Sequence, residues 1–117
     1  MKKYLTADRK WWVLTDGNTA SAGLTKQALS AYGELLVCHS HLAMPFAVSA
    51  QAPIAAIEGM HEFGCLSSPI AGRVLRFNAQ IENDPSSISP TTALFDYDRI
   101  TLSADLIELD NDALHGL

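Results

Sequence analysis

Short apolar runs interrupted by glycine, proline, asparagine and aspartate recur along this chain, and this pattern predicts many short strands. The clearest case is a pair of strand-like runs, residues 11–15 and 19–24, on either side of Asp16-Gly17-Asn18. An Asp-Gly turn between two such runs is the strongest short-range signal for a β-hairpin. The chain is therefore predicted to be mostly β and to open with a hairpin.

Two short helices are expected beside the strands. Thr25 is a suitable N-cap for a helix over residues 26–32, and Gly33 stands where a helix that ends in a left-handed conformation needs a glycine. Ser103 is expected to cap a second helix, over residues 104–110, near the C-terminus.

A second hairpin is predicted in the middle of the chain. Gly59 marks its turn, and its return strand leads into residues 68–72. The loop around Met44-Pro45 carries no clear pattern. Further strands are expected at residues 35–39, 54–57, 73–77 and 99–102.

Composition places the chain among compact globular proteins. It has 117 residues, of which 48% are hydrophobic and 18% charged, with a net charge of −5 and a pI near 5.1. One domain spanning residues 1–117 is expected, with a modest core of its own. Nucleic acids and anionic membranes select for clustered lysine and arginine, so a protein or small-molecule partner is expected instead.

Charge is unevenly distributed along the chain. From Glu82 onward there are eight carboxylates and one cation, Arg99. The simplest interpretation is a solvated acidic tail segment, and the alternative is a docking surface for a basic partner.

The sequence favours a cytoplasmic protein. Lys2 and Lys3 are not followed by the apolar run of a signal peptide, and no stretch approaches the roughly 20 apolar residues of a membrane helix. In a reducing compartment Cys38 and Cys65 should be thiols, and Cys38, which follows Leu35-Leu36-Val37, is expected to be a small core residue.

Three stretches, read in order, follow the motifs of one known family. Residues 5–11 read Leu-Thr-Ala-Asp-Arg-Lys-Trp, residues 23–35 begin with Gly-Leu-Thr and end with Gly-Glu-Leu, and residues 55–74 run from Ala-Ala-Ile-Glu to Ser-Pro-Ile-Ala-Gly-Arg-Val. In this order and spacing they resemble the H protein of the glycine cleavage system. Two differences stand out: Arg9-Lys10 replaces the family's His-Glu, and residues 90–95 replace its Pro-Tyr-Gly-x-Gly-Trp segment.

The resemblance implies a barrel-sandwich hybrid, as in biotinyl and lipoyl carriers, with short flanking helices and the lipoylated lysine at a hairpin tip. Counting three residues on from Glu58, or eight residues back from Pro69, places His61 at that lysine's position. Its neighbours in the turn are Gly59, Met60 and Glu62.

Histidine at this position matters chemically. A primary amine forms a stable amide with the lipoyl carboxylate, whereas an acylated imidazole is activated and hydrolyses. The chain's lysines lie outside the hairpin, and they are Lys2, Lys3, Lys10 and Lys26. We therefore expect neither lipoate nor another cofactor, and the alternative for His61 itself is a solvated turn residue.

These features predict a non-lipoylated, H-protein-like binding or regulatory module and not an enzyme. Its expected partners are proteins, among them glycine-cleavage or lipoate-handling enzymes, with no role for nucleic acid or membrane. It could act as competitor, chaperone or regulator of a true lipoyl carrier.

A different class of function would reuse the fold for metal binding or histidine-based chemistry through His39, His41, His61 and Cys65. Two strand residues two apart share a face, so His39 and His41 could share a metal, and a neutral imidazole is both a ligand and a base. The sequence has neither Cys-x-x-Cys nor His-Glu-x-x-His spacing.

Exposed apolar residues are a further candidate feature. Alternation along the first hairpin predicts that Trp11 packs inward and Trp12 outward. Near the second hairpin's tip, Met60, Phe63 and Leu66 would either form a docking site or be buried against a neighbouring element.

Overall fold

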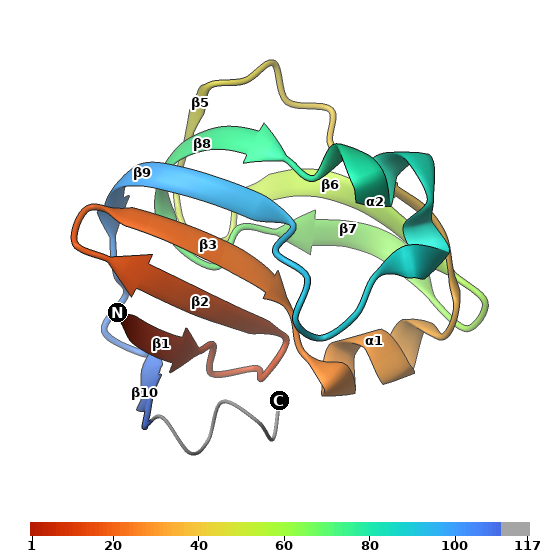
Figure 1. Ribbon diagram of the computed structural model, residues 1–117, viewed down its shortest axis with the longest axis horizontal. Helices are drawn as coiled ribbons and strands as arrows, with labels where there is room; N and C mark the ends of the chain where they lie inside the picture. Colours follow the sequence, from red (N-terminus) through yellow and green to blue (C-terminus); the bar gives the residue numbers. More distant parts are fainter. Residues whose placement is uncertain (111–117) are drawn as a thin grey trace.

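The computed structural model describes residues 1–110 and arranges them in two antiparallel sheets with short helices at one end (Figure 1). Within these residues, the larger sheet has seven strands in the order β10-β1-β2-β3-β9-β8-β5, and the smaller has three in the order β4-β6-β7. The strands are β1 (Lys2–Leu5), β2 (Trp11–Asp16), β3 (Thr19–Leu24), β4 (Leu35–His39), β5 (Phe46–Val48), β6 (Pro53–Gly59), β7 (Phe63–Ser67), β8 (Ala71–Phe77), β9 (Phe95–Thr101) and β10 (Ile107–Leu109).

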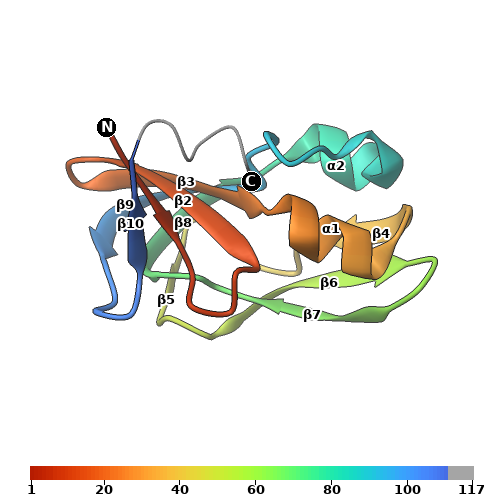
Figure 2. The ribbon, with the colours of Figure 1, turned by 90° about the horizontal axis from the view of Figure 1, so that it is seen from below.

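Both predicted hairpins are present. β2 and β3 pair in register from Trp11↔Leu24 to Asp16↔Thr19, with Gly17 at a φ of 64° in the turn between them. β6 and β7 form the second hairpin, which supplies two of the three strands of the smaller sheet. The smaller sheet lies below the larger one in Figure 2, which agrees with the predicted barrel-sandwich hybrid.

The predicted first helix is confirmed as α1 (Lys26–Tyr32). The Thr25 hydroxyl accepts a hydrogen bond from the Ala28 N–H, and Gly33 closes the helix with a φ of 75°. Two further helical segments were not predicted: α2 (Ala79–Asn83), in which the Gln80 and Ile81 N–H groups donate to the Asn78 side chain, and the 3-10 helix η1 (Pro85–Ser87).

The predicted helix over residues 104–110 is wrong. Residues 107–109 form β10 instead, which pairs antiparallel with β1 from Lys3↔Leu109 to Leu5↔Ile107. Without this partner, β1 would present unpaired backbone groups at the edge of the larger sheet, and the ladder satisfies them. Lys2 also lies 3.6 Å from Glu108 across the pair.

The predicted last strand begins earlier than expected. β9 starts at Phe95, and two of the acidic residues assigned to a solvated tail lie within it. Asp98 accepts two hydrogen bonds from Arg73 of β8, and Asp96 accepts one from Arg76. Cross-strand pairing therefore explains part of the acidic segment.

The core lies between the two sheets. Trp11, Cys38 and Leu66 are buried there, as predicted for Trp11 and Cys38. Trp12 was expected to face solvent but is only 5% exposed, because its indole N–H donates to the Pro90 carbonyl (2.8 Å) and the loop that carries Pro90 covers it. In the described part of the chain, no helix is long and apolar enough to cross a membrane.

Candidate functional site

The tip of the β6–β7 hairpin rests on the C-terminal end of α1 (Figure 2). The Gly59 N–H donates to the Glu62 carbonyl (2.7 Å) and closes the turn. The next two N–H groups point to the segment after the helix: Met60 donates to the Glu34 carbonyl (3.0 Å) and His61 to the Tyr32 carbonyl (2.9 Å). The backbone of the turn is therefore held by two contacts outside its own hairpin.

Two glycines permit this close approach. A Cβ on Gly59 would clash with the Tyr32 carbonyl oxygen. A Cβ on Gly33 would lie 2.5 Å from Cδ2 and 3.0 Å from Nε2 of His61, so the imidazole lies directly against the Gly33 backbone. Because glycine has no side chain, the hairpin tip can approach the end of α1 this closely at both positions. A larger residue at either position would push the two segments apart.

His61 itself is exposed at the tip, although part of its ring lies against Gly33. Its backbone N–H is hydrogen-bonded, whereas its imidazole makes no hydrogen bond to any other residue in the range 1–110. The ring is thus placed by packing and remains accessible from solvent.

The outer face of the smaller sheet carries apolar side chains next to this tip. Val37, Glu58 and Phe63 lie side by side across the three strands, and all three are exposed. Phe63 is 85% exposed and Met60, in the turn, 63%. Of the three apolar residues considered at the tip, only Leu66 is buried in the core.

A hollow separates the tip from the loop that precedes β2. Arg9, Lys10 and Glu62 line it together with the side of α1 at Tyr32. The Lys10 ammonium lies 5.2 Å from the centre of the Tyr32 ring, a distance typical of cation–π contact. Arg9-Lys10, the pair that stands where the family has His-Glu, therefore lies close to the hairpin tip in space.

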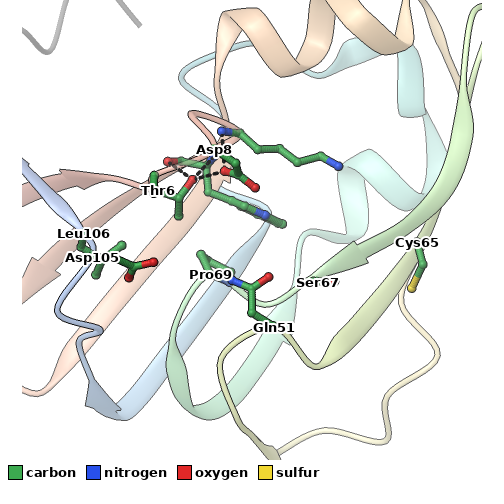
Figure 3. A pocket seen from close by; sticks show the side chains of 11 residues that line it. Thr6, Asp8, Gln51, Cys65, Ser67, Pro69, Asp105 and Leu106 are labelled. Atoms are coloured by element: carbon green, nitrogen blue, oxygen red, sulfur yellow. Dashed lines mark hydrogen bonds between the residues drawn. The ribbon is translucent and has the colours of Figure 1, made fainter.

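A second cavity, of about 230 Å³, lies farther along β7 (Figure 3). Its walls come from the loop before β2, from the β7 strand and the residues after it, and from the turn before β10. Asp8 organises one wall: its carboxylate accepts hydrogen bonds from the Thr6 hydroxyl (2.6 Å) and the Lys10 N–H (2.9 Å). This cavity was not predictable from local sequence patterns, because the segments that form it are far apart along the chain.

The structure does not bring the candidate metal ligands together. His39 is at the end of β4, where its Nδ1 lies 2.7 Å from Glu82, and His41 lies beyond that strand, so the two do not share a strand face. Cys65 stands in the same cross-strand row as His39, with Ala56 between them, which puts the two backbones about 10 Å apart. Within residues 1–110, no three histidine, cysteine or acidic side chains are grouped to hold a metal ion.

The two cysteines differ in environment. Cys38 is buried in the core, and burial, with a smaller contribution from Glu82, raises the pKa of its thiol to about 11. Cys65 is exposed on β7. Cys38 is therefore a protonated packing residue at neutral pH, as its apolar sequence context suggested.

Comparison with known proteins agrees with the architecture. A model of the family described as glycine cleavage H-protein matches residues 2–92. A glycine cleavage system H protein from Anoxybacillus flavithermus is 26% identical over 104 residues, which are 86% of this chain and 78% of the relative. A mitochondrial H protein from Mesembryanthemum crystallinum is 30% identical over 78 residues, 67% of this chain and 47% of the relative.

A solved structure extends the likeness to the whole fold. The crystal structure of a glycine cleavage system H protein from Mycobacterium marinum superposes with a TM-score of 0.78 at 23% identity, covering 98% of this chain and 97% of the other. The two-sheet architecture and the family match over residues 2–92 lead to one conclusion: this chain belongs to the glycine cleavage H-protein family.

Proposed function

We propose that this chain is a non-lipoylated member of the H-protein family that acts as a binding or regulatory module, without carrying a reaction intermediate itself. The observation that carries the proposal is His61. Counted from Glu58 and from Pro69, His61 corresponds to the position of the lipoylated lysine in the family that this chain resembles. An imidazole does not form a stable amide with lipoate.

The surroundings of His61 support the same proposal. No lysine occurs between Lys26 and the C-terminus, so the hairpin offers no substitute amine. The imidazole lies against Gly33, and the turn is hydrogen-bonded to the end of α1. A tip without an amine offers no attachment point for a lipoyl arm, whereas its shape can still be recognised by another protein.

The proposed partners are glycine-cleavage or lipoate-handling enzymes, and the cytoplasm is the proposed location. The module would compete with a lipoylated carrier for those enzymes, protect that carrier, or regulate its activity. It is proposed to act by binding and without catalysis, as expected for a relative of a carrier protein; within residues 1–110, the histidine, cysteine and acidic side chains form no group that could hold a metal ion.

Intact-mass measurement tests the absence of lipoate. The full chain is expressed in lipoate-replete cells beside an H protein that has the lysine. We expect the mass of the unmodified chain for this protein and a lipoyl increment for the control. A lipoyl increment on this chain would refute the proposal.

The variant His61→Lys tests whether lipoate-attaching enzymes still recognise the tip. Lysine fits sterically because the ring it replaces is exposed. A lipoyl increment on His61→Lys, combined with none on the wild type, would trace the lost modification to this one residue. An unmodified variant would show that recognition of the hairpin by the attaching enzyme has also been lost.

A further inference from the structure

A hollow of about 340 Å³ lies on the outer face of the larger sheet, across β2, β3, β9 and β8. Figure 1 shows these four strands side by side. The floor of the hollow lies over the Ala20–Tyr97 pair, whose side chains point away from it into the core. The hollow is therefore a feature of the larger sheet, and the β6–β7 hairpin takes no part in it.

Strand register arranges the walls of this hollow in two rows of outward-facing side chains. The first row crosses four strands as Leu14, Ser21, Asp96 and Arg76. The second row crosses the same strands as Asp16, Thr19, Asp98 and Arg73. The whole first row lines the hollow, but only Asp16 and Thr19 of the second row do so. The hollow therefore runs diagonally, from Asp16 on β2 to Arg76 on β8.

Arg76 is held in place and still has hydrogen-bond donors to offer. Its Nε donates to one oxygen of the Asp96 carboxylate (2.6 Å), and the Ser21 hydroxyl donates to the other oxygen (2.8 Å). The two Nη groups of Arg76 make no hydrogen bond to any residue in the range 1–110, and the side chain is 71% exposed. Arg73, one row away, instead donates to Asp98 from both Nε and Nη2. Arg76 thus keeps the planar pair of donors that binds a carboxylate.

The opposite end of the hollow offers a carboxylate. Asp16 forms no ion pair with another described residue, and the Thr19 hydroxyl donates to its backbone carbonyl, which leaves the carboxylate free. Two half-buried leucines line the hollow between these charges. Leu14 lies on the Asp16 side, and Leu75 lies beside Arg76, where the register of β8 with β9 shifts and the strand bulges.

From this arrangement, we infer that the hollow binds a small linear molecule with a carboxylate at one end, an ammonium group at the other and an apolar chain between them. The carboxylate pairs with the Nη groups of Arg76, the ammonium pairs with Asp16, and the chain covers Leu14 and Leu75. β2 and β8 are three strand spacings apart, about 14 Å. The two side chains reach over part of that distance, so a short chain spans the rest.

The three charged side chains of the hollow disfavour ligands with a single charge. An anion would meet the carboxylates of Asp16 and Asp96 against the one guanidinium of Arg76. A cation would leave the Nη donors of Arg76 unused. A molecule with both charges satisfies both ends, and this inference does not depend on His61 or on the proposed function.

An NMR titration of the full chain tests the inference by following the backbone amides. The probe is 6-aminohexanoate, and hexanoate and hexylamine are the single-charge controls. We expect saturable shifts at Ser21, Leu75 and Asp96, with 6-aminohexanoate binding about tenfold more tightly than either control, since each end adds one charge-assisted hydrogen bond.

Substitutions at the two ends separate their contributions. Arg76→Gln should weaken 6-aminohexanoate to the affinity of hexylamine, and Asp16→Asn should weaken it to that of hexanoate. Arg73→Gln is the matched control on the same strand and should leave the affinity unchanged, because Arg73 does not line the hollow. Arg76→Lys keeps the charge without the planar donors and should bind with intermediate affinity. The dispersion of each spectrum shows whether the variant is folded.

Three results would overturn the inference: no saturable shift at the three amides, equal affinities for 6-aminohexanoate and hexanoate, or binding that folded Arg76→Gln and Arg76→Lys retain in full. The intact-mass test of the proposed function is separate. A lipoyl increment there would refute that proposal without touching this site, and a failed titration would leave the proposed function as it stands.

Discussion

The imidazole of His61 lies against the backbone of Gly33, with Cδ2 at 2.5 Å from the position that a Cβ would take. Gly33 also has a φ of 75° and a ψ of −160°, a conformation that is essentially restricted to glycine. The end of α1 and the tip of the β6–β7 hairpin are thus fitted to each other through these two residues. The contact joins segments that are 28 positions apart in the chain.

Gly33→Ala should therefore destabilise the protein for two reasons. The positive φ costs about 1–3 kcal/mol for a residue with a side chain, and the new methyl group overlaps the His61 ring. Gly17→Ala is the matched control, because Gly17 has a φ of 64° but open space around it. Urea unfolding should show a larger loss of unfolding free energy for Gly33→Ala than for Gly17→Ala.

A double-mutant cycle isolates the overlap with the ring. His61→Ala should recover part of the loss in the Gly33→Ala background, since it removes the clashing atoms, and should leave the Gly17→Ala background unchanged. Equal losses for the two glycine variants, with no recovery by His61→Ala, would contradict the packing of the imidazole on Gly33.

A buried hydrogen-bond pair should make Ser68 more important than its size suggests. The fully buried Ser68 hydroxyl donates to the Ile70 carbonyl (2.7 Å) and, since its proton is used there, accepts from the Tyr97 hydroxyl (2.9 Å). Ser68→Ala leaves two buried polar groups without this partner, at about 1–3 kcal/mol each. Tyr97→Phe leaves Ser68 its bond to Ile70 and should cost less.

Thermal or urea unfolding of the two single variants and the double variant tests this order. The double variant should lose less stability than the sum of the single losses, because Tyr97→Phe removes a group that Ser68→Ala has already left unsatisfied. Additive losses would show that the two hydroxyls do not act as a pair.

Trp12→Phe should loosen the loop that replaces the family's glycine-tryptophan segment. The variant removes the hydrogen bond from the indole N–H to the partly buried Pro90 carbonyl, a loss of about 0.5–1.5 kcal/mol. Amide hydrogen exchange should accelerate at Thr92, whose N–H bonds within the loop to Ser89. The amide of Leu94, which bonds to Ala22 of β3, serves as the internal control and should keep its protection.

The Arg73–Asp98 pair should contribute stability that disappears in acid. Hydrogen bonds from Arg73 lower the pKa of Asp98 below its usual value, and the same bonds raise the pKa of Arg73. Because the folded pKa of Asp98 is below the unfolded one, its contribution is complete above the unfolded pKa of about 4 and is lost as the pH falls through the folded value.

Asp98→Asn should accordingly lower stability at pH 7, and the deficit should be smaller at an acid pH below the unfolded pKa, because protonation of the wild-type carboxyl removes the same charge. Asp16→Asn is the control, since the Asp16 carboxylate forms no ion pair in the described range. Urea midpoints at the two pH values check the prediction. A deficit of the same size at both would mean that the charge of Asp98 is not what stabilises the pair.

The sequence by itself determined those elements whose turn or capping residues all lie within a few positions of one another. Asp16-Gly17 between two alternating runs predicted the first hairpin, and Thr25 with Gly33 predicted both ends of α1. Turn and capping preferences arise from backbone conformation and neighbouring hydrogen bonds, so they can be read without knowing the rest of the fold. That His61 excludes a stable lipoyl amide stays a prediction from the sequence, and it depends on the chemistry of the side chain alone.

Only the tertiary structure decided the features that depend on a distant partner. Residues 107–109 have a helix-compatible pattern but form β10, because pairing with β1 satisfies backbone hydrogen-bonding groups of both strands. Trp12 is buried by a loop that lies nearly 80 residues away in the chain. The position of His61 against Gly33 and the exposure of Phe63 follow from how the second hairpin meets α1. Side-chain pattern specifies which face of an element is apolar, whereas long-range packing selects what covers that face.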